Sequence, residues 1–591
     1  MIKYPLDPNY LLRKKNSIRR NLLQETNLSE KRIAILGGST IAEVKDMLEL
    51  FLLQDGIKPI FFEFEYNRYY ENIIFHNSEL EEFSPDIIYI HTSNVNIKRY
   101  PSIHESESEI EALLTSEIDR FKQMWDSIAS RYACPVIQNN FELPHYRGLG
   151  NFDVYDIHGR TRYISELNSR FSEQARLRSS LYINDINYLA AWFGLERWYD
   201  KTFWYSYKYA MNYEAIPLLA DSVASIIKAI YGKSKKCLVL DLDNTLWGGV
   251  IGDDGLNGIQ IGNETPEGEA FTEFQEYCKI LKERGVILAV CSKNDEVNAR
   301  EGFSHPDSIL KLNDFSVFQA NWEPKYENIR NIAESLNISL NSLVFADDNA
   351  MEREIVQSQS PEIAVPALGN NVTKYINILD KTGYFEAVSL SSEDIMRSSF
   401  YMDNNLRKEH QIEFANYDDF LKSLEMKSEI KAFAPVYLDR ITHLINKTNQ
   451  FNLTTRRYNQ AEIESISNNS RYITLYGRLL DKFGDNGLIS IIIGEIRNFE
   501  IHIDIWLMSC RVLKRKMENA MFNQLVFRAK KQKITTIYGY YYPTNKNSMV
   551  SGLFEQMGFT KIGEGDSGNT TWRFEIPTDF CNTDFLINVN P

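Results

Sequence analysis

The feature that most constrains the fold is the stretch 236–247, in which an apolar run ends in two carboxylates one residue apart. Residues 237–240 have the length and composition of a strand that is buried on both faces of a parallel sheet. Asp241 and Asp243 then emerge at the carboxyl end of that strand, where open α/β sheets bind their ligands. The stretch therefore predicts an α/β domain with phosphoryl chemistry at this edge of its sheet.

The composition bounds the class of protein. A chain of 591 residues is too long for one core and predicts roughly three to four domains of about 100–200 residues. With 43% hydrophobic and 25% charged residues it is typical of globular proteins, and its net charge of -15 argues against a nucleic-acid partner. The six cysteines show no CxxC or zinc-like spacing, and neither a signal peptide nor a long apolar span is visible. We expect a cytoplasmic protein with reduced thiols and no membrane span.

Residues 1–231 predict a parallel sheet, because apolar runs alternate with helical segments. The expected strands begin at Arg32, Lys58, Asp86 and Pro135. The first strand ends in Gly37-Gly38-Ser39, which would place a hydroxyl at a strand-to-helix corner, and residues 92–94 after the third strand could supply an oxyanion donor.

This arrangement resembles the SGNH (GDSL-like) hydrolase fold, whose catalytic serine lies in a Gly-Asp-Ser block and whose Asp-x-x-His block comes near the end of the domain. Here Gly38 replaces the aspartate, and Phe203 stands three residues after Asp200 where the histidine belongs. A serine without a base is a weak nucleophile. We therefore expect a degenerate domain in which Ser39 caps a helix.

Further polar side chains follow apolar runs in the segment 235–385. Because the carboxyl ends of parallel strands meet at one edge of a sheet, these side chains are expected to converge beside Asp241. Taken singly, each has a structural alternative, such as a helix cap or a surface lysine; their order and spacing favour a site. The residues are Ser292, Lys325, Asp347 and Asp348.

The residue types suit phosphoryl transfer, which needs an in-line nucleophile, a metal ion and donors to the phosphoryl oxygens. Asp241 would attack phosphorus, while Asp243 would protonate the leaving oxygen and later activate water. The predicted phosphate-binding residues are Thr245, Ser292 and Lys325. The predicted all-oxygen Mg²⁺ ligands are Asp241, Asp243 through its carbonyl, Asp347 and Asp348.

Together these motifs, from Asp241-Leu-Asp-Asn-Thr245 to the acidic pair, resemble motifs I to IV of the haloacid dehalogenase (HAD) superfamily. The insertion between the first two motifs has only about forty residues, so the resemblance implies a Rossmann-like domain without a large cap. Four stretches look like the FkbH-like branch of HAD subfamily IIIC: 242–255, 290–295, 321–325 and 344–353.

A connector is expected at 386–426 and a third, mixed-sheet α/β domain at 427–580. An antiparallel strand pair within 487–508, a helix to about 531 and a strand from 534 resemble the GNAT superfamily of N-acetyltransferases. In that superfamily an Arg/Gln-x-x-Gly-x-Gly/Ala turn holds the pyrophosphate of coenzyme A on helix-terminal amides. Lys514 and Lys516 stand in place of the glycines, which argues against acetyl transfer from acetyl-CoA.

The FkbH-like resemblance implies that 1,3-bisphosphoglycerate loses both phosphates and that its glyceryl group is loaded as a thioester on the phosphopantetheine of an acyl carrier protein. The acyl phosphate needs a thiolate to attack its carbonyl. Cys291, beside Ser292, is either that thiol or a small apolar side chain packed in the sheet. Cys510 and the thiol of the carrier itself are alternatives.

Two other classes of function stay open. The first is a capless Mg²⁺ phosphatase that acts on a sugar phosphate or nucleotide-sugar phosphate in polysaccharide assembly. The second is a non-catalytic assembly module that keeps the HAD motifs only for binding.

Overall fold

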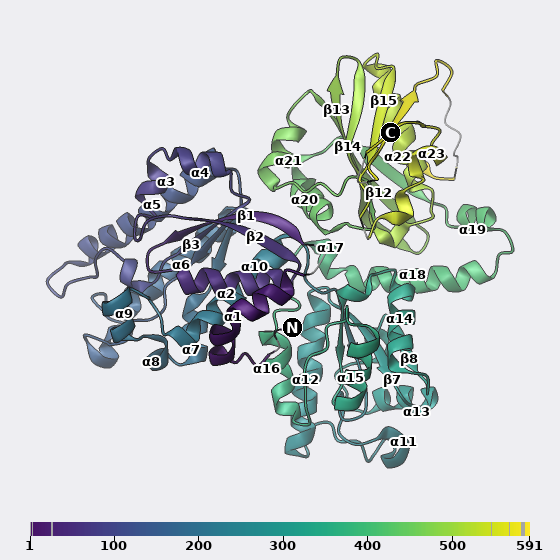
Figure 1. Ribbon diagram of the computed structural model, residues 1–591. Coiled ribbons are helices and arrows are strands. Elements are labelled where there is room, and N and C mark those ends of the chain that lie inside the picture. Colours follow the sequence, from purple (N-terminus) through teal and green to yellow (C-terminus); the bar gives the residue numbers. More distant parts are fainter. Residues whose placement is uncertain are drawn as a thin grey trace. The chain divides into compact units, whose positions relative to one another are not determined.

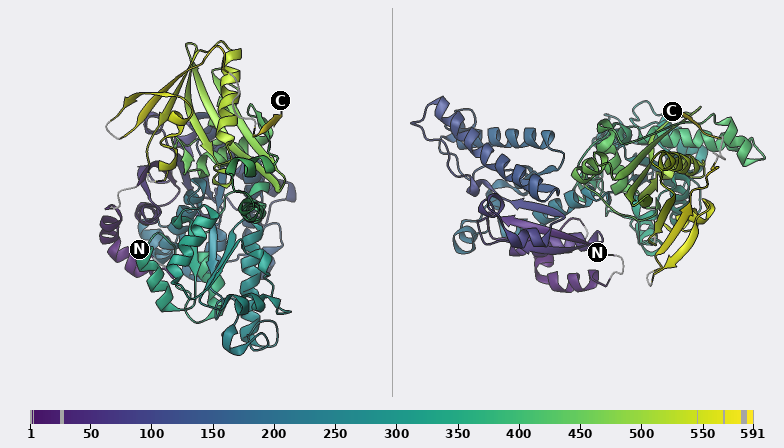
Figure 2. Two further views of the ribbon diagram at one scale, coloured as in Figure 1. Left: turned by 90° about the vertical axis from the view of Figure 1, so that its right-hand side faces the viewer. Right: turned by 90° about the horizontal axis from the view of Figure 1, so that it is seen from above.

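The computed structural model describes residues 2, 4–24, 28–544, 546–565, 568–580 and 586–590. The chain divides into two compact units, Met1–Ile230 and Tyr231–Pro591, which can be followed by colour in Figures 1 and 2. Two parallel sheets and one mixed sheet, all combined with helices, confirm the predicted α/β class. Within the described residues, no helix has both the length and the apolar surface needed to cross a membrane.

The sheet of the N-terminal unit is entirely parallel, as predicted. Its strands lie in the order β2 (Ile57–Glu63), β1 (Ser29–Gly37), β3 (Ile87–His91), β4 (Val136–Asn139) and β5 (Leu181–Asn184). One face is covered by α5 (Glu107–Arg131) and α6 (Arg160–Leu177), whose apolar side chains share a core with β1 and β3. Elsewhere α1 (Pro8–Leu22), α2 (Ala42–Gln54) and α10 (Ile216–Ile230) pack against one another (Figure 1).

The corner after β1 differs from the prediction. Helix α2 begins at Ala42 with Ile41 at its N-cap, so Ser39 does not cap it. Four residues, 38–41, separate the end of β1 from the start of α2, so Ser39 lies two residues before the N-cap position.

The second unit begins with a smaller parallel sheet. Its strands lie in the order β8 (Val317–Ala320), β7 (Ile287–Ser292), β6 (Cys237–Leu240) and β9 (Leu343–Ala346). Helix α12 (Pro266–Glu283) packs with α16 (Tyr375–Lys381), and α14 (Lys325–Leu336) packs with α15 (Ala350–Gln359) (Figure 1). Between β6 and α12, in a fully described segment, the sole helix is the single turn α11 (Ile251–Asp254). The site edge of this sheet therefore carries no cap domain.

The third sheet is mixed. Its strands lie in the order β16 (Thr560–Glu564), β17 (Thr570–Glu575), β15 (Thr536–Tyr541), β14 (Glu500–Met508), β13 (Gly484–Arg497), β12 (Tyr472–Asp481), β10 (Lys427–Lys431) and β18 (Asn588–Asn590). Helix α22 (Met517–Lys531) covers one face, while α20 (Leu438–Lys447) and α21 (Gln460–Ser467) cover the other. Successive residues of β13, such as Ile491 and Ile492, enter opposite cores, as the pleat of a strand requires.

Two features of this region were not predicted. Strand β18 pairs with β10 and so extends the sheet beyond the expected end at 580. The connector holds the long helix α18 (Arg397–Ile412), which contacts both β7 and β13 (Figure 1). Its Tyr401 is buried in the core of the smaller parallel sheet, and its Arg407 pairs with Asp481 of β12 at 2.8 Å. The connector is thus packed against both sheets.

Candidate active site

Three aspartates converge at the carboxyl edge of the smaller parallel sheet. Asp241 follows β6, and Asp347 with Asp348 follows the adjacent strand β9. One carboxylate oxygen from each of the three lies within 4.8 Å of the others. Asp241 and Asp347 are buried, and Asp348 is half-buried. Burial of three acids in so small a volume requires a compensating positive charge.

Lys325, the first residue of α14, supplies part of that charge. Its Nζ lies 2.9 Å from Asp241 Oδ1 and 2.6 Å from Asp347 Oδ2, and only 4% of its side chain is exposed. Burial alone would lower the pKa of Lys325, but the charges of Asp241 and Asp347 outweigh it and raise that pKa. Burial and the neighbouring Asp241 charge still raise the pKa of Asp347 to about 6. One lysine therefore leaves the cluster with surplus negative charge.

The cluster fits a hard divalent cation. Its donors are carboxylate oxygens, which are the ligands that Mg²⁺ prefers in proteins. The raised pKa values of Asp347 and Asp348 reflect burial and repulsion by Asp241, which a cation would relieve. Asp241, Asp347 and Asp348 are the residues that would hold it.

The carboxylate of Asp243 is not a member of this cluster. Its Oδ1 accepts hydrogen bonds from Trp247 Nε1 and the Ile251 backbone, both at 3.0 Å. Its Oδ2 accepts from Asn294 Nδ2 at 2.8 Å. The side chain is therefore oriented by three donors and is separate from the acidic triad; a metal contact through its backbone carbonyl stays a prediction.

The two predicted hydroxyls occupy strand-end positions with different partners. Thr245 Oγ1 accepts from the backbone N–H of Asp348 at 3.2 Å and thereby ties the loop after β6 to the loop after β9. Ser292 Oγ, at the end of β7, accepts from Asn294 Nδ2 at 3.2 Å. Both side chains are buried, and their contact with a phosphoryl group stays a prediction.

Cys291 lies in an apolar environment. It belongs to the core formed with Val239 and Phe345, and its thiol donates to the carbonyl of Lys325 at 3.6 Å. Burial raises the pKa of the thiol, which disfavours the reactive thiolate. Of the two alternatives for Cys291, these observations favour the packed side chain. Cys510 lies after β14 and is half-buried.

The N-terminal unit presents hydroxyls without a catalytic base beside them. Ser39 Oγ is buried and has no hydrogen-bond partner among the described residues. Glu142, after β4, accepts from the backbone N–H of Asn94 at 3.2 Å, and burial raises its pKa to about 7. His145 stacks on Tyr199 with the ring centroids 4.3 Å apart. No interaction among the described residues joins Ser39 to Glu142 or His145.

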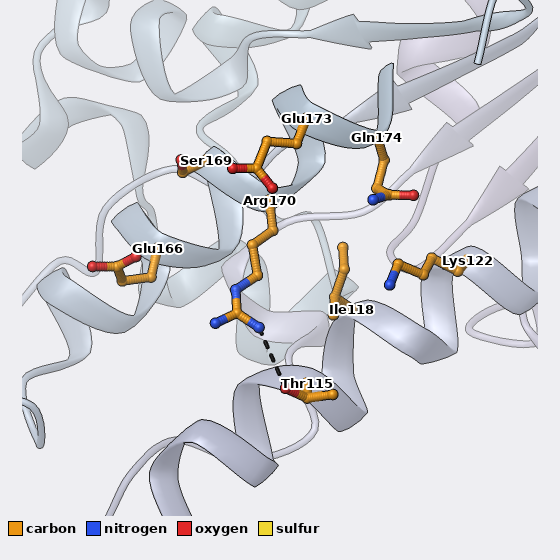
Figure 3. Close-up of a pocket in the computed structure, with 8 residues that line it drawn as sticks. All are labelled: Thr115, Ile118, Lys122, Glu166, Ser169, Arg170, Glu173 and Gln174. Atoms are coloured by element: carbon orange, nitrogen blue, oxygen red, sulfur yellow. Dashed lines mark hydrogen bonds between the residues drawn. The ribbon is translucent and has the colours of Figure 1, made fainter. Parts of the chain in front are cut away.

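A shallow groove of about 390 Å³ lies between α5 and α6 of the same unit (Figure 3). Its central Arg170 is held by Glu111 at 2.7 and 2.9 Å and by Thr115 at 3.3 Å. The central arginine of the groove is thus already paired, and we assign no ligand to the groove.

Sequence reasoning missed the two side chains that hold Asp243. Asn294 lies two residues beyond the predicted Ser292, and Trp247 lies four residues beyond Asp243. The signal in the sequence was that both residues lie close to the motifs. That Asn294 contacts Asp243 follows from the pairing of β7 with β6, which the local sequence does not show.

Comparisons with known proteins found a matching family and similar solved structures. The family described as "FkbH, N-terminal domain" matches residues 32–228. The solved N-terminal part of the protein BF1531 from Bacteroides fragilis, described as containing a phosphatase domain complexed with Mg, is 32% identical. That match covers 64% of this chain and 99% of the other, with a TM-score of 0.59. No curated protein matches the chain at a significant level.

Partial matches to other solved structures have much lower scores. The ribosomal-protein-S18-alanine N-acetyltransferase of Escherichia coli is 13% identical over 27% of this chain and 99% of its own, with a TM-score of 0.21. Ard1 of Thermoplasma volcanium is 14% identical over 25% of this chain and 98% of its own, also with a TM-score of 0.21. The conclusion therefore rests on the larger match together with the site: the chain belongs to the FkbH-like family of the haloacid dehalogenase superfamily.

Proposed function

We propose that the chain is a Mg²⁺-dependent enzyme that removes phosphoryl groups through an aspartyl-phosphate on Asp241. The observation that carries the proposal is the buried triad of Asp241, Asp347 and Asp348 with Lys325 placed between two of its members. A structural ion pair needs one carboxylate for each lysine. The surplus acids are explained by a site for a cation and a phosphoryl group.

In the proposed reaction a carboxylate oxygen of Asp241 forms the new bond to phosphorus. The ester or anhydride bond breaks, and its electron pair leaves with the oxygen, which takes a proton from Asp243. Asp243 then removes a proton from the water that hydrolyses the aspartyl-phosphate. Lys325, Thr245 and Ser292 would bind phosphoryl oxygens. When bound, Mg²⁺ supplies charge neutralisation at those oxygens.

For the substrate we propose 1,3-bisphosphoglycerate, whose glyceryl group would pass as a thioester to the phosphopantetheine of an acyl carrier protein. The support is membership of the FkbH-like family together with an uncapped site edge, which leaves room for a substrate or acceptor carried on another protein. Since Cys291 is packed in a core and its pKa is raised, we assign the attack on the acyl carbonyl to the thiol of the carrier.

A second candidate is a capless phosphatase that acts on a sugar phosphate or nucleotide-sugar phosphate. Its support is the acidic cluster with Lys325, which by itself requires neither a carrier protein nor a thiol. A non-catalytic assembly module is the third candidate, and it leaves the surplus of buried acids unexplained.

Incubation of the protein with 1,3-bisphosphoglycerate, Mg²⁺ and a holo carrier protein separates the three. We expect the carrier to gain the mass of a glyceryl group, and Cys291→Ala to leave this transfer intact. Phosphate release without any adduct on the carrier would leave the plain phosphatase. Absence of phosphate release from every phosphate ester tested would leave the assembly module.

A further inference from the structure

The carboxylate of Asp243 is held at both of its oxygens by side chains from two different loops. Trp247 donates to Oδ1 from the loop after β6, and Asn294 donates to Oδ2 from the loop after β7. Neither side chain belongs to the acidic cluster. Both are buried; Asn294 is 4% exposed.

Asn294 also joins Asp243 to the strand-end serine. Its Nδ2 lies 2.8 Å from Asp243 Oδ2 and 3.2 Å from Ser292 Oγ. A side-chain amide nitrogen carries two hydrogens, so one amide can donate to both oxygens at once. The amide therefore fixes the distance between the predicted proton donor and a predicted phosphate-binding hydroxyl.

The indole of Trp247 cannot move aside easily. Its ring makes an edge contact with Phe303 at a centroid distance of 5.3 Å. Gly302 is so close that a Cβ there would lie 2.8 Å from the ring. The indole N–H thus has one orientation, which it uses to hold Asp243.

We propose that Asn294 and Trp247 are positioning residues that aim the Asp243 carboxyl at the leaving oxygen. The proposal rests on the proposed phosphoryl transfer, in which the proton moves from Asp243 to that oxygen as the phosphorus–oxygen bond breaks. Such a transfer needs the two oxygens within hydrogen-bond distance, about 2.6–3.2 Å. With Asn294 removed, Oδ2 loses its donor and the carboxylate can rotate away.

Substrates with different leaving groups distinguish misorientation of the Asp243 carboxyl from damage to the whole site. An alkoxide is a poor leaving group and needs the proton, whereas p-nitrophenolate leaves without one. Since kcat/KM reports the steps up to release of the leaving group, loss of aim should lower it for glycerol 3-phosphate and much less for p-nitrophenyl phosphate. A damaged site should lower it for both equally.

The experiment compares kcat/KM for these two substrates, with Mg²⁺, in the full-length protein and three variants. For Asn294→Ala we expect the ratio of glycerol 3-phosphate to p-nitrophenyl phosphate to fall by about tenfold to a hundredfold, within the range of general-acid effects. For Trp247→Phe, which keeps a packed ring but removes the N–H, we expect a smaller fall in the same direction. Lys293→Ala is the matched control, because its ammonium pairs with Glu352 at 2.6 Å instead of Asp243.

An unchanged ratio in both Asn294→Ala and Trp247→Phe would overturn the positioning role, and so would an equal loss on the two substrates. If Asn294→Ala does not fold, judged by circular dichroism, the ratio for Trp247→Phe decides the question. Absence of phosphate release by the wild-type protein from both of these substrates and from 1,3-bisphosphoglycerate would overturn the proposed function and, with it, this role.

Discussion

At the scale of single residues, Lys325 neutralises part of the negative charge of the acidic cluster. It is the partner of both Asp241 and Asp347, so Lys325→Met should leave two buried carboxylates unpaired. We expect the free energy of unfolding, measured in urea without metal, to fall by about 3 kcal/mol. Lys293→Met is the control, since its half-exposed pair with Glu352 should be worth less than about 1 kcal/mol. Equal losses in the two variants would contradict the assigned role.

Glu142 predicts a pH dependence of stability in the N-terminal unit. Burial raises its pKa from 4.5 to about 7, so the folded state binds a proton more tightly than the unfolded state. Stability is therefore full below about pH 4.5 and is lost as the pH rises to about 7, by about 3 kcal/mol in all. Glu142→Gln should flatten this part of the thermal unfolding profile between pH 4.5 and 8. A profile identical to that of the wild type would contradict the prediction.

Single residues also show where sequence reasoning ends. Asp241, Lys325 and Asp347 could be found because each follows or opens an element at motif spacing, and the structure brings them within contact. Ser39 was misread as a helix cap because the length of the turn after β1 is not encoded in its glycines. The partners of Asp243 depend on which strands become neighbours, and this is decided by packing.

At the scale of the element, the turn between β14 and α22 has the left-handed backbone conformation that favours glycine, although lysines occupy it. Lys514 and Lys516 have φ values of 65° and 60°, a region that costs a non-glycine residue about 1–2 kcal/mol. Lys514→Gly should therefore raise the free energy of unfolding by about 0.5–1 kcal/mol. Lys531→Gly, at the last residue of α22 where φ is not positive, should give no such gain. A destabilised Lys514→Gly variant would contradict this account of the turn.

The same turn and the adjacent strand edge are occupied by the chain itself. Residues Phe451–Asn452 pair with the end of β14, and Leu453 N–H donates to the Trp506 carbonyl at 3.2 Å. Lys516 pairs with Asp418 at 3.1 Å. We expect coenzyme A at millimolar concentration to leave the unfolding temperature of the protein unchanged. A rise of several degrees would show that coenzyme A binds and that residues 451–453 can leave the edge of β14.

Elements with a strong apolar period could be predicted, and marginal ones could not. Strands β6, β7 and β9 are continuous buried runs. By contrast, β8 is half-buried over most of its length, and β18 has three residues. Such short strands are specified by the neighbours with which they pair, and the local sequence carries little of that information.

For the whole molecule, the division into two compact units has a functional consequence. All residues of the acidic cluster and the side chains around it belong to 231–591, whose two sheets are joined by the packed helix α18. The fragment 231–591 should therefore fold alone and release phosphate at a rate within about threefold of the full chain, because no group of the site is removed. An inactive but folded fragment, as judged by circular dichroism, would show that residues 1–230 contribute to the reaction.

The measurement that tests the central claim most directly is mass spectrometry of the protein quenched in acid during turnover of a phosphate ester with Mg²⁺. In the wild-type protein we predict a phosphoryl adduct on the peptide that contains Asp241. In Asp241→Asn we predict that both the adduct and phosphate release are lost. Phosphate release that survives in Asp241→Asn would contradict the assignment of Asp241 as the nucleophile.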